Sequence, residues 1–280
     1  MTETPGTSPR VEGTADSCAA TPQDPHTAHD PHDHSDHDHP PTGADLVRDL
    51  VRGLSIVALL IPVVIVVLLI AILPMAPSTP LPLVLGLGLG AAHLLSLVVT
   101  SLFVSRTRRQ LAVNPGLLAV RSTVEELLRV AAVLLGLLLW PGELRGELGV
   151  WIGAGAAIVW LVLATAQTVS TRRRIASPSQ WAEDAVATLL HHRVGARSTV
   201  VMRLLDVIGT ACFQVGATVL VILSPVLVIG TAVLSIGSGL STLVLQRRPP
   251  AERAGTAWAY VPLGVGVLTL LLAVLGLATA

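Results

Sequence analysis

The sequence contains no lysine, and all eighteen of its basic residues are arginine. A P-loop requires a lysine to reach the phosphates, and a Ser–Lys dyad requires one as its base. The absence of lysine therefore excludes both sites. It also excludes a Schiff base with retinal or pyridoxal phosphate, because that bond forms on a lysine amine.

Cysteine is nearly absent as well, since the chain has only Cys18 and Cys212. These two residues are too few and too far apart for a disulfide framework or a cysteine-based zinc site. Cys212 lies within an apolar stretch, where we interpret it as a small buried hydrophobic residue.

Charge is scarce too: 13% of the 280 residues are charged, and 52% are hydrophobic. A soluble domain carries about a quarter charged residues, so the composition indicates a membrane protein. The charges are also segregated. Residues 1–53 hold ten acids against three arginines, and the remainder holds fifteen arginines against eight acids. This pattern predicts an acidic solvated tail attached to a body with basic loops.

What the chain has instead is a series of long apolar stretches. Residues 54–73 form a charge-free run of twenty; as a helix it would reach about 30 Å, the thickness of a bilayer's hydrocarbon core. A Ser224-Pro225 break divides a later stretch that is too long for one pass. We therefore predict an all-α, polytopic membrane protein with about seven transmembrane helices in residues 54–280. The predicted spans are 54–73, 81–104, 123–140, 150–169, 204–223, 225–245 and 257–278.

The arginines predict the orientation of this bundle. Those outside the apolar stretches fall on every second connection, and the opposite connections hold only Arg145. In this count Arg129 is assigned to the basic connection that precedes the third span. The positive-inside rule then places the N-terminus in the cytoplasm and the C-terminus outside the cytoplasmic (inner) membrane.

Two shorter segments flank the spans. Residues 42–53 carry apolar side chains on one face, which predicts an amphipathic juxtamembrane helix that lies on the membrane or extends the first span. Residues 178–194 predict a helix on the cytoplasmic membrane surface, begun by a capping box at Ser177 and Gln180.

Residues 1–41 are rich in proline, aspartate and histidine, and we predict that they are disordered. Imidazoles among carboxylates can bind Zn, Ni, Co or Cu, here loosely and at several sites. The alternative is a solvating low-complexity tail. The histidines concerned are His26, His29, His32, His34, His37 and His39.

Four polar residues inside the predicted spans are the candidate site, because an unpaired polar group is costly in lipid. His93 is a candidate proton relay or metal ligand; alternatively it hydrogen-bonds Ser96, Thr100 or a neighbouring helix. Asp206 either pairs with Arg203 at the inner interface or contributes to a substrate or proton site. Gln167 and Gln214 are candidates for hydrogen bonds between helices.

Three functions remain open at this stage, and the sequence predicts no catalytic residue. The first is a small permease or transport-associated subunit with a metal- or pH-responsive tail. The second is a membrane scaffold or regulatory subunit that binds a membrane or cytoplasmic partner through Arg172, Arg173 and Arg174. The third is a membrane-embedded enzyme. The lipid bilayer is a partner in each case, and no nucleic acid is expected.

Overall fold

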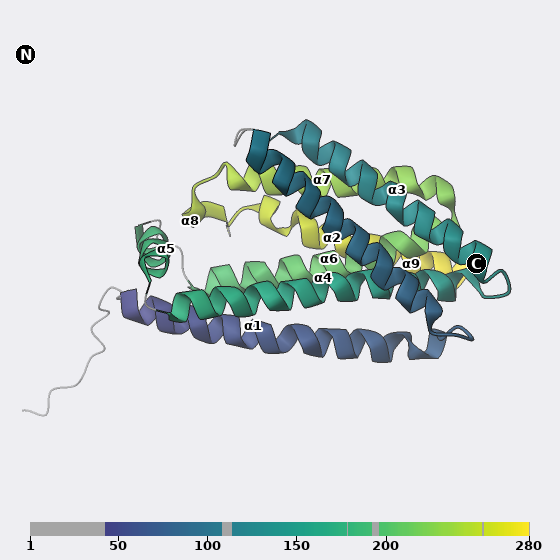
Figure 1. Ribbon diagram of the computed structural model, residues 1–280, viewed down its shortest axis with the longest axis horizontal. Coiled ribbons are helices and arrows are strands. Elements are labelled where there is room, and N and C mark those ends of the chain that lie inside the picture. The colour runs from purple at the N-terminus through teal and green to yellow at the C-terminus, as the bar shows by residue number, and fades with distance from the viewer. Residues whose placement is uncertain (1–42, 108–113, 178, 192–195, 254, 280) are drawn as a thin grey trace, which may run out of the picture. The chain divides into compact units, whose positions relative to one another are not determined.

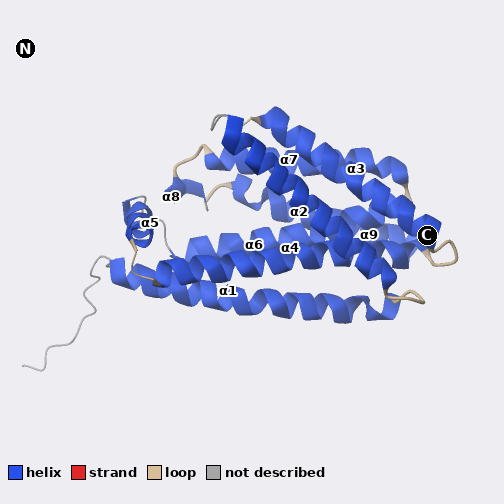
Figure 2. Ribbon diagram, viewed as in Figure 1, coloured by secondary structure: helices blue, strands red, loops and turns tan. Residues whose placement is uncertain are grey.

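The computed structural model describes residues 43–107, 114–177, 179–191, 196–253 and 255–279. Every regular element within these ranges is a helix, and no strand occurs in them (Figure 2). The predicted all-α fold is therefore confirmed. The tail of residues 1–41, with its six histidines, lies outside the described residues.

Long helices make up most of the described chain (Figure 1). The long helices are α1 (Gly43–Ile72), α2 (Leu81–Thr107), α3 (Pro115–Leu139), α4 (Arg145–Ala176), α6 (Ala196–Leu223), α7 (Val228–Gln246) and α9 (Val261–Thr279). The short helices are α5 (Gln180–His191) and α8 (Pro250–Arg253), and single 3₁₀ turns cover Leu73–Met75, Pro225–Leu227 and Ala257–Tyr260.

Within the described residues, six segments are long and apolar enough to cross a membrane, judged by length and composition alone. The break at Ser224 and Pro225 does separate two of them, because a 3₁₀ turn at Pro225–Leu227 ends α6 and starts α7. The six segments are Gly43–Met75, Leu81–Leu102, Arg145–Ala176, Ala196–Leu223, Pro225–Gln246 and Ala257–Thr279.

Helix α3 is where the structure departs from the prediction of seven apolar spans. It begins at Pro115, where the side chain of Asn114 accepts a hydrogen bond from the Gly116 amide at 2.8 Å, as an N-cap should. It is as long as the other helices, but it is not among the segments that qualify by composition. The reason is its four charged residues: Arg121, Glu125, Glu126 and Arg129.

Arg129 also corrects the count of loop arginines. Its side chain is 1% exposed inside the bundle, so its assignment to a basic connection is wrong. The error arose because a count by sequence position cannot distinguish a loop arginine from one that is buried by neighbouring helices.

The described parts of the two flanking segments are helical, with limits that differ from the predicted ones. Residues 43–53 continue without a break into α1, where Leu50 and Leu54 pack against Ile175 of α4. In the described chain α5 begins at Gln180, and the Ser179 hydroxyl accepts a hydrogen bond from the Ala182 amide at its start. Residues 178 and 192–195 of the predicted helix lie outside the described chain.

Six of the long helices form a ring in which each helix contacts the next: α2, α4, α6, α9, α7, α3 and back to α2. We call this arrangement the six-helix ring. Helix α1 packs outside it, against α4 and α6 (Figure 1). The α5 end of the ring is where α2, α4 and α7 finish and α3, α6 and α9 begin; the opposite end is called the far end.

Glycines allow close approach along one side of the ring. A methyl group on Gly86 of α2 would lie 2.1 Å from the carbonyl oxygen of Ile152 in α4. A methyl group on Gly266 of α9 would lie 2.1 Å from the carbonyl oxygen of Gly209 in α6. Each of these contacts therefore depends on the absence of a side chain.

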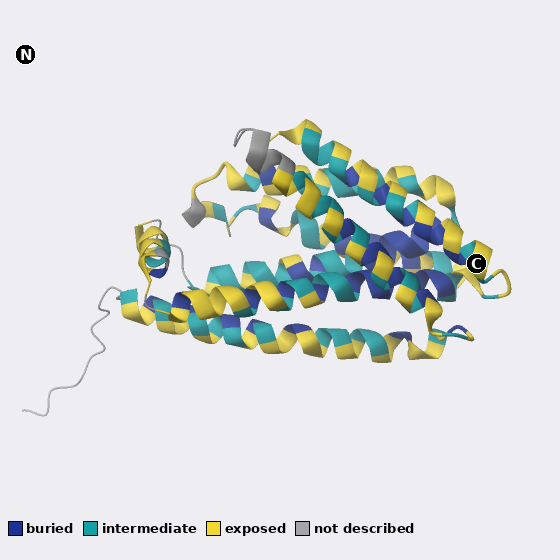
Figure 3. Cartoon of the chain, viewed as in Figure 1, coloured by how far each residue is buried: buried dark blue, intermediate teal, exposed yellow. Residues whose placement is uncertain are grey.

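Exposed residues recur along the outer faces of the helices (Figure 3), and many of them are large aliphatic residues. A protein surface in water rarely carries so continuous an apolar area. Examples are Leu59 and Ile70 on α1, Leu95 on α2, Leu127 and Leu138 on α3, Ile229 and Val233 on α7, and Leu275 on α9.

Candidate functional site

A pocket of about 450 Å³ lies inside the ring, toward the α5 end. All six ring helices contribute to its wall, and its polar side chains come from four of them. Volumes of this size are typical of sites for small organic ligands. Its polar lining residues are Arg121 and Glu125 of α3, Trp160 and Gln167 of α4, Arg203, Asp206, Thr210 and Gln214 of α6, Ser235, Ser238 and Thr242 of α7; α2 and α9 contribute apolar residues such as Leu97 and Val265.

Two pairs of opposite charges face this polar pocket. On α3, the Arg121 Nε atom donates to the Glu125 carboxylate at 2.7 Å, one helical turn away. On α6, Arg203 lies 3.9 Å from the Asp206 carboxylate and donates to the Gln167 side-chain oxygen at 2.5 Å. The Asp206 side chain is 58% exposed, so solvent reaches the mouth of the pocket.

The deep end of the pocket is formed by Gln214 and Phe213. Gln214 is 5% exposed, and its side-chain oxygen accepts a hydrogen bond from Arg129 Nη2 at 2.8 Å. The Arg129 guanidinium also lies over the Phe213 ring, 5.3 Å from its centroid, which is cation–π distance. The floor of the pocket therefore rests directly on a buried arginine.

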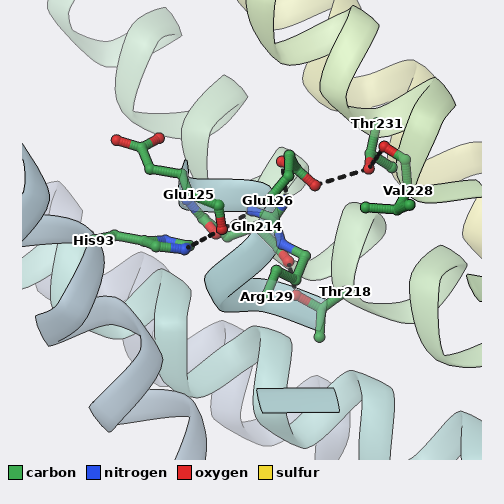
Figure 4. A network of polar contacts seen from close by, with 8 residues as sticks. All are labelled: His93, Glu125, Glu126, Arg129, Gln214, Thr218, Val228 and Thr231. Carbon is green, nitrogen blue, oxygen red and sulfur yellow. Dashed lines mark hydrogen bonds and ion pairs between the residues drawn. The ribbon is translucent and has the colours of Figure 1, made fainter. Parts of the chain in front are cut away.

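Arg129 belongs to a polar network that joins α3, α6 and α7 (Figure 4). Its guanidinium pairs with Glu126 on the preceding turn of α3. The other carboxylate oxygen of Glu126 accepts a hydrogen bond from the Thr231 hydroxyl of α7 at 2.8 Å. We call Glu126, Arg129, Gln214 and Thr231 the buried network. All four side chains are shielded from solvent.

Beyond the buried network, toward the far end, the ring is filled by an apolar cluster. Its buried members are Val133 of α3, Leu148 of α4, and Val221 and Ile222 of α6. The polar pocket thus reaches solvent at the α5 end, while the network and this cluster close the path to the far end.

His93 is not one of the described residues that line the pocket, but it lies next to Glu125, which does line it. It is completely buried, and its Nε2 atom donates to the backbone carbonyl of Glu125 at 3.0 Å. This bond ties α2 to the turn of α3 that carries one of the pocket's charges. Its Nδ1 atom is then an acceptor with no hydrogen-bond partner among the described residues.

The structure brings together three of the four polar residues singled out in the sequence. Gln167 of α4 lines the polar pocket together with Asp206 and Gln214, which lie about two turns apart on α6. The expected pairing of Asp206 with Arg203 is present at 3.9 Å. His93 takes the alternative role considered for it, a hydrogen bond to a neighbouring helix.

Glu126 and Arg129 were missed, although a signal for them exists. The buried residues of α3 include Ser122, Glu126, Arg129, Val133 and Gly136, which recur at three- and four-residue spacing. The opposite face of the same helix carries exposed leucine and valine. A helix with its charges on the same stripe as its small residues indicates an inward-facing polar face.

The remaining predicted site residues fall elsewhere. Arg172, Arg173 and Arg174 are exposed on the last turns of α4, at the α5 end. Within the described residues no group of three or more His, Cys, Asp or Glu side chains is arranged to hold a metal ion. The six tail histidines were outside that search. The pocket offers hydrogen bonds and compensated charges, which suit the recognition of a polar solute.

Comparisons with known proteins identify no relative. No protein-family model, no curated protein and no solved structure matches this chain.

Proposed function

We propose that this chain is a multi-pass membrane protein and that its six-helix ring is a permease for a small polar solute. The observation that carries the proposal is the polar pocket, which reaches solvent at one end of the ring and is closed at the other. A carrier needs a site of this kind, which faces one side of the bilayer at a time.

The distribution of side chains supports the membrane environment. Leucine, isoleucine and valine are exposed on the outer faces, whereas charged and polar groups such as Arg129 and Gln214 are buried. This distribution is the reverse of that in a water-soluble bundle. Apolar outer faces cost the least free energy when lipid surrounds them.

Under this proposal α3 also crosses the membrane, as the third span in chain order, and brings the number of spans to seven. Both of its acids have an arginine partner, Glu125 with Arg121 and Glu126 with Arg129. Paired, inward-facing charges are the form in which ionisable residues are tolerated at membrane depth. The positive-inside rule then assigns the α5 end, with Arg172, Arg173 and Arg174, to the cytoplasm, the N-terminus with it and the C-terminus outside.

Transport would require the closed end to open. The buried network and the cluster around Leu148 and Ile222 separate the pocket from the far end. An outward-open state must therefore break the link between Arg129 of α3 and Gln214 of α6, or move both helices together.

The experiment is uptake by proteoliposomes that contain the purified full chain. The probes are radiolabelled leucine, glucose, choline and succinate, which represent zwitterionic, neutral, cationic and anionic solutes. We expect saturable uptake of at least one probe and a loss of about tenfold or more in Asp206→Asn. Asp184→Asn on the exposed face of α5 is the matched control and should transport normally. If no probe enters faster than into empty liposomes, the permease assignment is wrong.

A second function is favoured by the exposure of Arg172, Arg173 and Arg174 at the end of α4. Three guanidiniums on one exposed turn suit an acidic partner or lipid headgroups. If the protein is a scaffold, its partner should no longer co-purify when all three arginines are changed to glutamine. The unaltered protein should then show no solute uptake. Metal or pH control through the tail histidines stays a prediction.

A further inference from the structure

We propose that the polar pocket recognises an α-amino acid with an apolar side chain, whose carboxylate binds Arg203 and whose ammonium binds Asp206. This inference rests on the proposed function, because it names the solute class of the same pocket. It concerns binding, however, so it can be tested apart from transport.

The charges that line the pocket are Arg121, Glu125, Arg203 and Asp206. The first two neutralise each other through a hydrogen-bonded ion pair of 2.7 Å. The second two lie 3.9 Å apart, which is beyond hydrogen-bonding distance. Arg203 and Asp206 therefore attract each other while both retain hydrogen-bonding capacity for a ligand.

The geometry around Arg203 suits a carboxylate. A guanidinium has five N–H donors in a planar fork, and one of them is engaged by Gln167 at 2.5 Å. The remaining donors can form the two parallel bonds that carboxylates prefer. Gln167 also holds the guanidinium from α4, which positions it before a ligand arrives.

Asp206 suits the ammonium group. Its carboxylate accepts no hydrogen bond from Arg203 at 3.9 Å, and its side chain is 58% exposed at the pocket mouth. An ammonium supplies three donors to such a carboxylate. Asp206 and Arg203 are one turn apart on α6, and their charged groups lie 3.9 Å from each other. A ligand that carries its amine and its carboxylate on one carbon can therefore contact both.

Net charge favours a zwitterion over a simple cation or anion. The four lining charges sum to zero, so a singly charged ligand would leave an uncompensated charge in a pocket surrounded by apolar helices. A zwitterion contacts both members of the pair and adds no net charge.

The rest of the wall suits an apolar side chain. Trp160, Phe213, Val207 and Val265 line the pocket around the two charge pairs, on α4, α6 and α9. Aromatic and aliphatic surfaces of this kind bind hydrocarbon groups by excluding water from both. A pocket of about 450 Å³ is large enough for such an amino acid with ordered water.

Three probes with one carbon skeleton test the assignment on the full-length protein in detergent. Leucine has both charged groups, 3-methylbutylamine lacks the carboxylate, and 4-methylpentanoate lacks the ammonium. Isothermal titration calorimetry should give a dissociation constant for leucine at least about tenfold lower than for either analogue, because each loses one charged hydrogen-bonding partner. Equal binding of the amine or the carboxylate, or no binding of leucine, overturns the proposal.

Two variants locate the site. Asp206→Asn and Arg203→Gln should each weaken leucine binding by about tenfold or more, while Asp184→Asn on α5 leaves it unchanged. The thermal unfolding of each variant without ligand shows whether the bundle is intact. Leucine affinity that is unaltered in both folded pocket variants contradicts the assignment.

The outcomes separate this inference from the permease proposal. Leucine binding without any uptake supports the assigned site and removes the transport function. Saturable uptake of glucose, choline or succinate by a protein that does not bind leucine supports the permease and overturns the amino-acid assignment.

Discussion

The two sides of the six-helix ring are held together by different interactions. Along α2, α4, α6 and α9, glycines let the backbones touch, as at Gly86 against Ile152 and at Gly266 against Gly209. Across α3 and α7, the buried network adds a charged link, in which Glu126 accepts a hydrogen bond from Thr231, and Gly239 of α7 packs against the side chain of Leu118 rather than against backbone. One side depends on backbone contact at glycines, and the other combines side-chain packing with buried, compensated charge.

This difference bears on motion. Packed backbones gain their energy from many short contacts, so a small displacement loses most of it. A charged network has few links, and each can be exchanged for another partner or for water. The comparison therefore suggests that the α2–α4–α6–α9 side is the fixed wall of the pocket and the α3–α7 side is the part that moves. Three sets of substitutions test it, in decreasing order of expected effect.

The largest effect is expected for Arg129→Met, because it leaves the Glu126 carboxylate buried without its partner. Removing one member of a buried ion pair costs about 3–5 kcal/mol. The free energy of unfolding, measured by denaturation in mixed detergent micelles, should fall by that order.

The double variant Arg129→Met with Glu126→Gln serves as the control for lost volume. It should recover part of the stability, since the uncompensated charge is then gone. If the double variant is as unstable as the single one, packing rather than charge holds this side of the ring.

Intermediate effects are expected for Gly86→Ala and Gly266→Ala. Each added methyl group would lie 2.1 Å from a backbone oxygen of the neighbouring helix, so the helices must separate. Overpacking of this kind costs about 1–3 kcal/mol. The measurement is the same unfolding free energy.

Matched controls lie two residues away on the same helices. Methyl groups at Gly88 of α2 and Gly264 of α9 would meet no atom within 4 Å. Gly88→Ala and Gly264→Ala should therefore be neutral or slightly stabilising, because alanine has the higher helix propensity. Equal destabilisation by all four variants would show that close approach is not the reason for glycine here.

The smallest effect is expected for Thr231→Val, which removes one hydrogen bond to Glu126 and keeps the shape of the side chain. Hydrogen bonds between membrane helices contribute about 0.6 kcal/mol on average. If the α3–α7 side moves during transport, this variant should alter the uptake rate more than the stability. An unchanged rate in proteoliposomes would argue against that role.

Much of the fold could be predicted from the residues alone, because helix formation and apolar length are local properties. The apolar run at residues 204–223 lies within α6 as expected, and the run at residues 54–73 lies within α1 except for Leu73, which begins a 3₁₀ turn. The limits were less accurate: α4 extends from Arg145 to Ala176, beyond the predicted 150–169, since a helix continues past its apolar portion. The candidate site was found in part, through Gln167, Asp206 and Gln214.

Which polar residues meet was decided by tertiary structure. Arg129 and Gln214 are separated by 85 residues in sequence, and Glu126 and Thr231 by 105. Periodicity can assign each of them to a face of its own helix, but it contains no information on which other helix that face will contact. The sequence alone therefore determined an all-helical chain with long apolar segments. The polar pocket, the buried network and the closed far end follow from the order in which the helices pack around the ring.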